Sequence, residues 1–248
     1  MLDIFSEKLL PIFLFFIIGY VLKKMNIVKK EDASVLLKLI FYILSPAVII
    51  MSVGNMEMKK ALIFYPISAI CIHIFMNIFG IILSKFLILN ENERKIFRGA
   101  TLIMNMTFIL PFFLVFYGEE NLYLLSLFDA GNLVMITTIV YSVFISSKDD
   151  MIFDKIKKLL KSPLIISLII GIIINVTGIK MPHGIEITME KLAEITGTLI
   201  MIALGMYFTP KLKRFKLSFI IVMIKILGML IAVFVLEKFL PLDEIGKK

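Results

Sequence analysis

Residues 99–117 read GATLIMNMTFILPFFLVFY, an apolar run interrupted near its midpoint by Asn105, Thr107 and Pro111. Proline has no amide hydrogen and disfavours helical backbone on its N-terminal side, so the run predicts a broken helix. Such a break frees backbone carbonyls, and the half-helix predicted to begin around Pro111 would present its positive end to an anion. Asn105 offers both donors and an acceptor beside the gap. A kinked helix with Asn105 bonded to a neighbour is the alternative.

The whole chain is too apolar for a soluble domain. Of its 248 residues, 60% are hydrophobic and 19% are charged, whereas soluble domains carry about 45–50% and about 25%. Its one cysteine and two histidines are too few for a disulfide framework or the usual zinc sites, so we expect no cofactor and no metal. The net charge of +8 does not indicate a nucleic-acid partner. Nucleic-acid binders collect Lys and Arg on one soluble face, whereas here these residues lie between the apolar runs.

A helix needs about 20 mainly apolar residues to cross a bilayer, and the chain contains eight candidate stretches. They are Leu9–Leu22, Ala33–Val53, Ala61–Leu89, Gly99–Tyr117, Leu122–Ser146, Pro163–Thr177, Ile187–Phe208 and Leu217–Leu240. The sequence therefore predicts an all-α polytopic membrane protein in contact with the lipid bilayer. Sixteen of the 27 Lys and Arg residues follow odd-numbered spans and seven lie on the other side. The positive-inside rule then predicts a multi-pass cell-membrane protein with its N-terminus outside.

An internal repeat relates the first and sixth spans. Pro11 and Gly19 lie eight residues apart, as do Pro163 and Gly171, and a shift of 152 residues superposes the two pairs. The same shift lays the second span over the seventh without a gap. Because five spans separate the two repeat starts, the second copy is predicted to insert upside down, as in many secondary transporters.

The repeat predicts the organisation of the chain. Residues 1–146 would form a first five-helix repeat, residues 147–162 a cytoplasmic linker, and residues 163–248 an incomplete second repeat of three helices. Eight spans would then be present of an expected ten. A protein that naturally has eight spans is the alternative.

Further polar residues inside the spans are candidates for function. A carboxylate at the bilayer centre costs roughly 2.5–3.5 kcal/mol, which makes Asp129 of the fifth span a functional candidate. A structural bond from Asp129 to the gap in the fourth span is the compatible alternative. Ser45 and Pro46 are predicted to break the second span, either as a kink facing a substrate cavity or as a point of close packing. Lys225 of the eighth span is expected to pair with Glu194.

Several motifs together resemble the auxin efflux carrier family of membrane permeases. They are Asn105-Met-Thr-Phe-Ile-Leu-Pro111, Phe116-Tyr-Gly-Glu-Glu120 and Asp129-Ala-Gly-Asn132, with Leu10-Pro11 to Gly19-Tyr20, Phe41-Tyr42 to Ser45-Pro46-Ala47 and Ser162-Pro163 to Gly171. The resemblance implies ten helices in two inverted five-helix repeats, similar to bile-acid symporters and sodium/proton antiporters. Helices four and nine of that fold are broken and cross near the bilayer midplane, beside the substrate.

The resemblance also implies roles for individual residues. Asn105 and Pro111 would lie at the crossing, and Asp129 with Asn132 would support it. The chain departs from the family pattern at Met106 and Thr107, where glycines are usual, and it lacks the ninth helix.

We therefore expect a secondary transporter of small organic anions that works by alternating access, coupled to a proton or a sodium ion. The residues expected to bind substrate are Asn105, Thr107, Pro111, Asp129, Asn132, Ser45 and Pro46. A truncated or split permease of the same family, inactive by itself, is the alternative, and a homodimer that shares halves remains open. We do not expect an enzyme, because Glu119 and Glu120 occupy a loop and His73 has no obvious ligand partner. His73 is expected to be a packed residue with one ring nitrogen satisfied.

Overall fold

The computed structural model describes residues 9–87, 90–140, 159–209 and 215–239, together with Glu7 and Lys157. These residues form helices and connecting turns, without a strand among them. The α-helices are α1 (Leu10–Lys24), α2 (Lys30–Leu39), α3 (Ser45–Gly54), α4 (Phe64–Phe86), α5 (Glu91–Leu102), α6 (Met106–Tyr117), α7 (Leu122–Met135), α10 (Pro163–Thr177), α11 (His183–Tyr207) and α12 (Phe215–Leu236). Two π-helical segments, η2 (Ile40–Leu44) and η5 (Ile136–Val140), and two 3₁₀ turns, η3 (Lys60–Ile63) and η4 (Glu119–Asn121), extend them.

Five helical stretches within the described residues are long and apolar enough to cross a membrane. They are Lys30–Gly54, Lys60–Phe86, Glu91–Tyr117, Glu119–Val140 and Ser218–Leu236. They match the predicted second, third, fourth, fifth and eighth spans, and confirm a polytopic helical membrane protein. The predicted first, sixth and seventh spans are helices as well (α1, α10 and α11), but the total of eight spans stays a prediction. Most of the predicted linker at 147–162, and the fifth span after Val140, lie outside the described residues.

Local sequence signals explain several helix ends. Asn90 begins α5 with a capping box, in which its side chain accepts from the amide of Glu93 at 2.9 Å and its own amide donates to the Glu93 carboxylate at 3.2 Å. Pro163 occupies the first turn of α10, where a missing amide hydrogen costs nothing. Gly178 ends α10 at a φ of 66°, a left-handed conformation that glycine adopts without strain.

The described chain divides into two compact units that are interleaved in sequence. Unit 1 comprises residues 1–57, 105–126 and 162–210, and unit 2 comprises residues 58–104, 127–161 and 211–248. The chain passes from unit 2 into unit 1 between Met104 and Asn105, inside the predicted fourth span.

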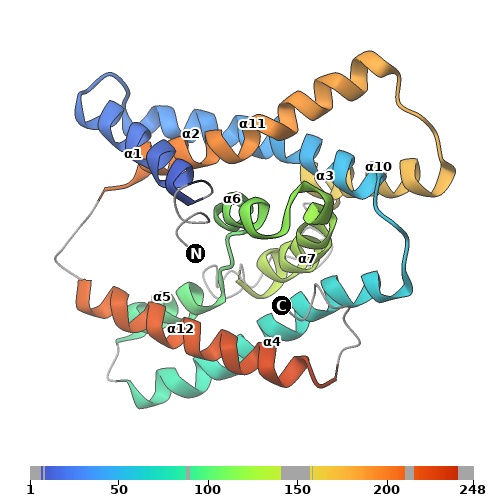
Figure 1. Cartoon of the computed structure of the whole chain (residues 1–248). Coiled ribbons are helices and arrows are strands. Elements are labelled where there is room, and N and C mark those ends of the chain that lie inside the picture. The colour runs from blue at the N-terminus through green and yellow to red at the C-terminus, as the bar shows by residue number, and fades with distance from the viewer. Residues whose placement is uncertain are drawn as a thin grey trace. The chain divides into compact units, whose positions relative to one another are not determined.

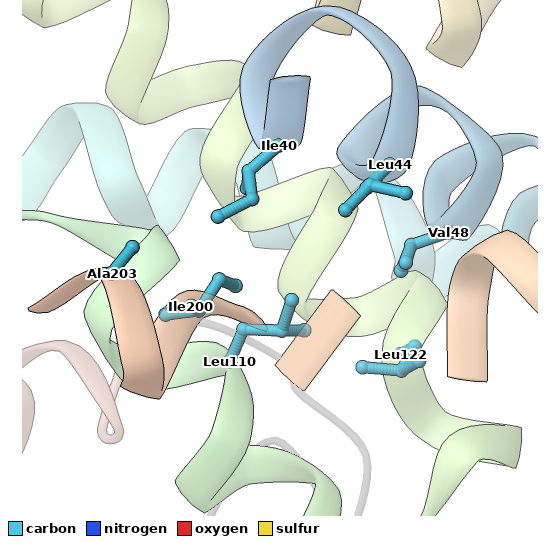
Figure 2. Close-up of a cluster of buried hydrophobic side chains, with 7 residues drawn as sticks. All are labelled: Ile40, Leu44, Val48, Leu110, Leu122, Ile200 and Ala203. Carbon is cyan, nitrogen blue, oxygen red and sulfur yellow. The ribbon is translucent and has the colours of Figure 1, made fainter. Parts of the chain in front are cut away.

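Unit 1 is built around α11, which packs against α1, α2, α3 and α6, while α10 packs against α3 (Figure 1). Its core is a cluster of buried aliphatic side chains from η2, α3, α6, α7 and α11, which Figure 2 shows gathered together. The members are Ile40, Leu44, Val48, Leu110, Leu122, Ile200 and Ala203. In unit 2, α4 packs against α5 and α12.

The contact between α1 and α11 brings the two backbones together. A Cβ atom on Gly19 would overlap the carbonyl oxygen of Ile202, so only glycine permits this approach. One turn further along α1, the Lys23 ammonium donates to the carbonyl oxygen of Phe208, just past the end of α11.

The contact between α10 and α3 has the same form. A Cβ atom on Gly171 would lie 3.0 Å from Cβ of Val53 and 3.4 Å from the carbonyl oxygen of Ile49. One turn further along α10, the Asn175 amide donates to the carbonyl oxygen of Met56 at 2.7 Å, just past the end of α3.

Candidate functional site: the break between two helices

The run 99–117 is not one continuous helix. α5 ends at Leu102 and α6 begins at Met106, and the backbone between them is extended, with ψ of 117° at Ile103 and 94° at Asn105. The amide of Ile103 still bonds back to the carbonyl of Gly99 at 3.0 Å, so helical bonding stops just after it. The broken helix predicted from the sequence is confirmed.

The position of the break differs from the prediction. The second half-helix begins at Met106, not around Pro111, and Pro111 lies buried inside α6. Proline removes one helical bond, from its own nitrogen to the carbonyl of Thr107, and α6 tolerates that single loss. Pro111 packs beside α11, since a Cβ atom on Gly197 would lie 3.9 Å from its Cα atom. The break is instead placed upstream, where side chains satisfy the exposed carbonyls.

Two carbonyl groups at the break accept hydrogen bonds from side chains of unit 2. Asn132 on α7 donates from Nδ2 to the carbonyl oxygen of Met104 at 3.3 Å. Lys225 on α12 donates from its ammonium to the carbonyl oxygen of Ile103. Because an unpaired carbonyl in an apolar medium is costly, these two side chains stabilise the interruption.

Within unit 2, the partner of Lys225 is the Ile103 carbonyl at the helix break. Its pairing with Glu194, a residue of unit 1, stays a prediction. A carbonyl deprived of its helical partner is a strong acceptor, and a lysine side chain long enough to reach it satisfies both groups.

Asp129 holds Asn132 in place. Its carboxylate accepts from Nδ2 of Asn132 at 2.6 Å, one turn away on α7. Both hydrogens of that amide are therefore used, one on Asp129 and one on Met104. Asp129 is thus linked to the backbone gap of the fourth span through Asn132. This is the structural role that was the alternative to a functional one for this carboxylate.

The other side of the break presents donors. Asn105 stands at the position before α6, but its side chain makes no cap with the first amides of the helix. Its carbonyl accepts from the amide of Phe108 at 3.1 Å. Asn105 is exposed and Thr107 is partly buried. The start of α6 therefore offers uncapped amides, an exposed carboxamide and the positive end of the helix dipole.

Ser45 and Pro46 do not break the second span. The helix continues from Lys30 to Gly54, and the π-helical turn η2 comes directly before Ser45, whose amide bonds to the carbonyl of Ile40. Pro46 has no amide hydrogen to donate. The π turn accommodates this by widening the helix, so the helix is not interrupted. Leu44 and Val48, on either side of this pair, belong to the same core cluster as Leu110, the neighbour of Pro111 (Figure 2).

His73 on α4 is a further buried polar residue of unit 2. It is fully buried, and its Nδ1 atom lies 2.8 Å from the carbonyl oxygen of Ala69. The expectation of a packed histidine with one satisfied ring nitrogen is confirmed. Sequence reasoning missed its proximity to Asn132, which is a neighbour only in the folded chain.

Apolar helices of membrane length, one of them interrupted and the interruption held by polar side chains, define a polytopic membrane protein with an irregular site inside an apolar helix. Residues 4–240 match the family described as membrane transport proteins. The chain belongs to this family, and the family recognised from the sequence is confirmed. It is also similar to an uncharacterized transporter of Methanocaldococcus jannaschii, with 27% identity over 223 residues, covering 84% of this chain and 70% of the relative.

Proposed function

We propose that this chain is a secondary transporter of small organic anions and that the anion binds at the start of α6, directly after the break in the fourth span. The observation that carries the proposal is the arrangement of polar groups at the break. Asn132 and Lys225 occupy the carbonyls of Met104 and Ile103, whereas the start of α6 has no side-chain cap. Since the acceptors are already used and donors remain, the break favours a ligand that accepts hydrogen bonds and carries negative charge.

In this proposal Asn105 donates to a substrate carboxylate, together with the first amides of α6 and the hydroxyl of Thr107. Pro111 shapes α6, and Asp129 with Asn132 supports the break from α7. Ser45 and Pro46 act at a distance, because the π turn beside them lies in the helix whose side chains pack around Leu110.

Alternating access requires two bodies of the protein that can move as units. The division of the chain into two compact units supports this mechanism, and the break coincides with the point where the chain passes from one unit to the other. Extended backbone at 103–105 can change direction more easily than a continuous helix, so it suits a hinge.

The packing within unit 1 supports the inverted repeat. A shift of 152 residues carries α1 onto α10 and α3 onto the C-terminal part of α11, and the α1–α11 contact has the same form as the α10–α3 contact. Gly171 of α10 lies against Ile49 and Val53 of α3, and Asn175, further along α10, bonds to Met56 just past the end of α3, so these two helices run parallel. Because α1 and α3 belong to consecutive predicted spans, α10 then runs opposite to α1, as an inverted repeat requires.

Uptake by proteoliposomes tests the proposed function. The purified protein is reconstituted and offered radiolabelled mono- and dicarboxylates, with protein-free liposomes as background. Asn105→Ala is expected to reduce uptake at least about tenfold, the loss of one or two charge-assisted hydrogen bonds. Asn55→Ala is the matched control, because Asn55 is exposed and bonds only to Met51 within its own helix.

Two outcomes would contradict the proposal. Uptake that Asn105→Ala leaves unchanged removes the assigned role of the break. Absence of uptake of every carboxylate, by protein whose helical circular dichroism and melting are intact, favours the alternative of an inactive or split permease.

The proposed orientation has a separate test. On a Cys71→Ala background, a single cysteine replacing Lys180 is expected to react with a membrane-impermeant maleimide in intact cells. A cysteine replacing Asn90 is expected to react only after permeabilisation, because the positive-inside rule places its loop in the cytoplasm. The reverse pattern would place the N-terminus inside.

A further inference from the structure

Three polar side chains of unit 2 lie near one another: Asp129 and Asn132 on α7, and His73 on α4. Asn132 is 2% exposed and His73 is 0% exposed. Polar and ionisable groups this deep in apolar helices are expensive, and their hydrogen bonds must be accounted for atom by atom.

The orientation of Asn132 follows from its partners. Its Nδ2 hydrogens go to the Met104 carbonyl and the Asp129 carboxylate, both of which accept. Turning the amide over would place oxygen against oxygen at both contacts, so Oδ1 faces the other way. There Oδ1 is buried and has no hydrogen-bond donor among the described residues.

The proton on His73 can be located in the same way. Nδ1 lies 2.8 Å from the carbonyl oxygen of Ala69, which only accepts, so Nδ1 carries a hydrogen. In a neutral imidazole this leaves a lone pair on Nε2. Nε2 is buried and also has no partner among the described residues, although the side chain of Asn132 lies beside the ring.

Two buried acceptors of neighbouring side chains, Nε2 of His73 and Oδ1 of Asn132, are therefore left without a hydrogen-bond donor among the described residues. One added proton resolves this mismatch. On Nε2 it turns the nitrogen into a donor to Oδ1 and completes a continuous chain from the Ala69 carbonyl to the Asp129 carboxylate.

We propose that His73 is the proton-binding group of the carrier, taking up a proton from water at Nε2, donating it as a hydrogen bond to Oδ1 of Asn132, and releasing it to water on the other side. The inference rests on the proposed function, because only a carrier moves the proton across the membrane. Asp129, which accepts from Nδ2 of Asn132, is the acidic group at the other end of this series of hydrogen bonds.

The surrounding charges couple this proton to an anion. The elements packed around α4 carry charged groups that include Asp129 on α7, Lys225 on α12, and Arg98 on α5, which bonds to Asn77 at 3.3 Å. The positive charge of Lys225 acts against a second positive charge on His73. The negative charge of a bound anion would offset that repulsion, so proton and anion would favour each other's binding and travel together.

Nitrogen NMR tests the proton site without any substrate. A His183→Asn variant, which alters an exposed loop-side residue, leaves His73 as the single histidine; it is labelled with ¹⁵N-histidine and placed in lipid nanodiscs between about pH 5 and pH 8. We expect Nδ1 protonated throughout and Nε2 changing from unprotonated to protonated as the pH falls. Asp129→Asn should lower the protonated fraction of Nε2 at a fixed acidic pH at least about threefold.

A protonation state that stays constant over this range, or a hydrogen on Nε2 with none on Nδ1, would overturn the proposal while leaving anion transport intact.

Proteoliposomes test the coupling. An acid-outside gradient should accelerate carboxylate uptake at least about fivefold in the unaltered protein and fail to do so in His73→Gln, which should still exchange anion for anion. An unchanged response to the gradient in His73→Gln would overturn the coupling, and absence of all uptake would count against the transporter function and not against the proton site.

Discussion

Asn175 donates from Nδ2 to the carbonyl oxygen of Met56, 2.7 Å away, and Lys23 makes the corresponding contact with the carbonyl oxygen of Phe208. Lys23 and Asn175 are 152 residues apart in the sequence, and so are Met56 and Phe208. The same contact therefore occurs twice in unit 1, each time between the last turn of one helix and the carbonyl just past the end of its partner. These side chains close helix ends that would otherwise leave carbonyls unpaired.

Removal of the Asn175 amide should destabilise the α3–α10 contact. Asn175 bonds to two carbonyls, those of Met56 and Gly54, so Asn175→Ala is expected to lower the free energy of unfolding by about 1–3 kcal/mol. Thermal unfolding in detergent measures the change. Asn55→Ala, with one bond inside its own helix, should melt like the unaltered protein; equal loss in both variants would show that the inter-helix bonds contribute nothing.

Gly19 should not tolerate even a methyl group. A Cβ atom there would overlap the carbonyl oxygen of Ile202, and backbone cannot move aside as a flexible side chain can. We expect Gly19→Ala to lower the free energy of unfolding by about 1–3 kcal/mol. Gly184→Ala is the control, because a Cβ atom there meets nothing within 4 Å. A Gly19→Ala protein as stable as the control would mean that α1 and α11 are further apart than described.

The Asn132 side chain should matter for stability as well as for uptake. Asn132→Leu removes the donor to the Met104 carbonyl and leaves the Asp129 carboxylate without its partner. The expected cost is about 1–3 kcal/mol in the free energy of unfolding. Faster amide hydrogen exchange at residues 99–110, measured by mass spectrometry, should accompany it, because the held break loses one of its two supports. Unaltered exchange in this segment would contradict the supporting role.

Lys225 should be required for uptake because of its charge and its length. Lys225→Met leaves the Ile103 carbonyl unpaired and removes the positive charge from the break, and we expect carboxylate uptake to fall at least about tenfold. Lys225→Arg should retain part of it. Lys238→Met, near the end of the same helix where the lysine lies over the Phe234 ring, serves as the matched control. Equal uptake by the Lys225→Met and Lys238→Met proteins would remove Lys225 from the site.

The class of the protein was determined by the sequence alone, because long apolar runs in a bilayer have few alternatives to the helix. A span must satisfy its backbone groups internally, so composition and run length are enough to predict helices. The broken helix at 99–117 and the family were also predictable, since proline, asparagine and motif order are local properties. The repeat spacing of 152 residues, read from Pro11 and Pro163, also separates the two contacts that Lys23 and Asn175 make in unit 1.

Only the tertiary structure decided where the break begins and what holds it open. Proline alone pointed to Pro111, but the helix stops at Leu102 because Asn132 and Lys225 satisfy the carbonyls that follow. These side chains are separated in sequence from the carbonyls they hold by 28 and 122 positions. Such proximity cannot be predicted from sequence periodicity, because it arises only when the helices of unit 2 pack together. The helix is then interrupted where its unpaired carbonyls find side-chain donors, since an unpaired carbonyl is costly.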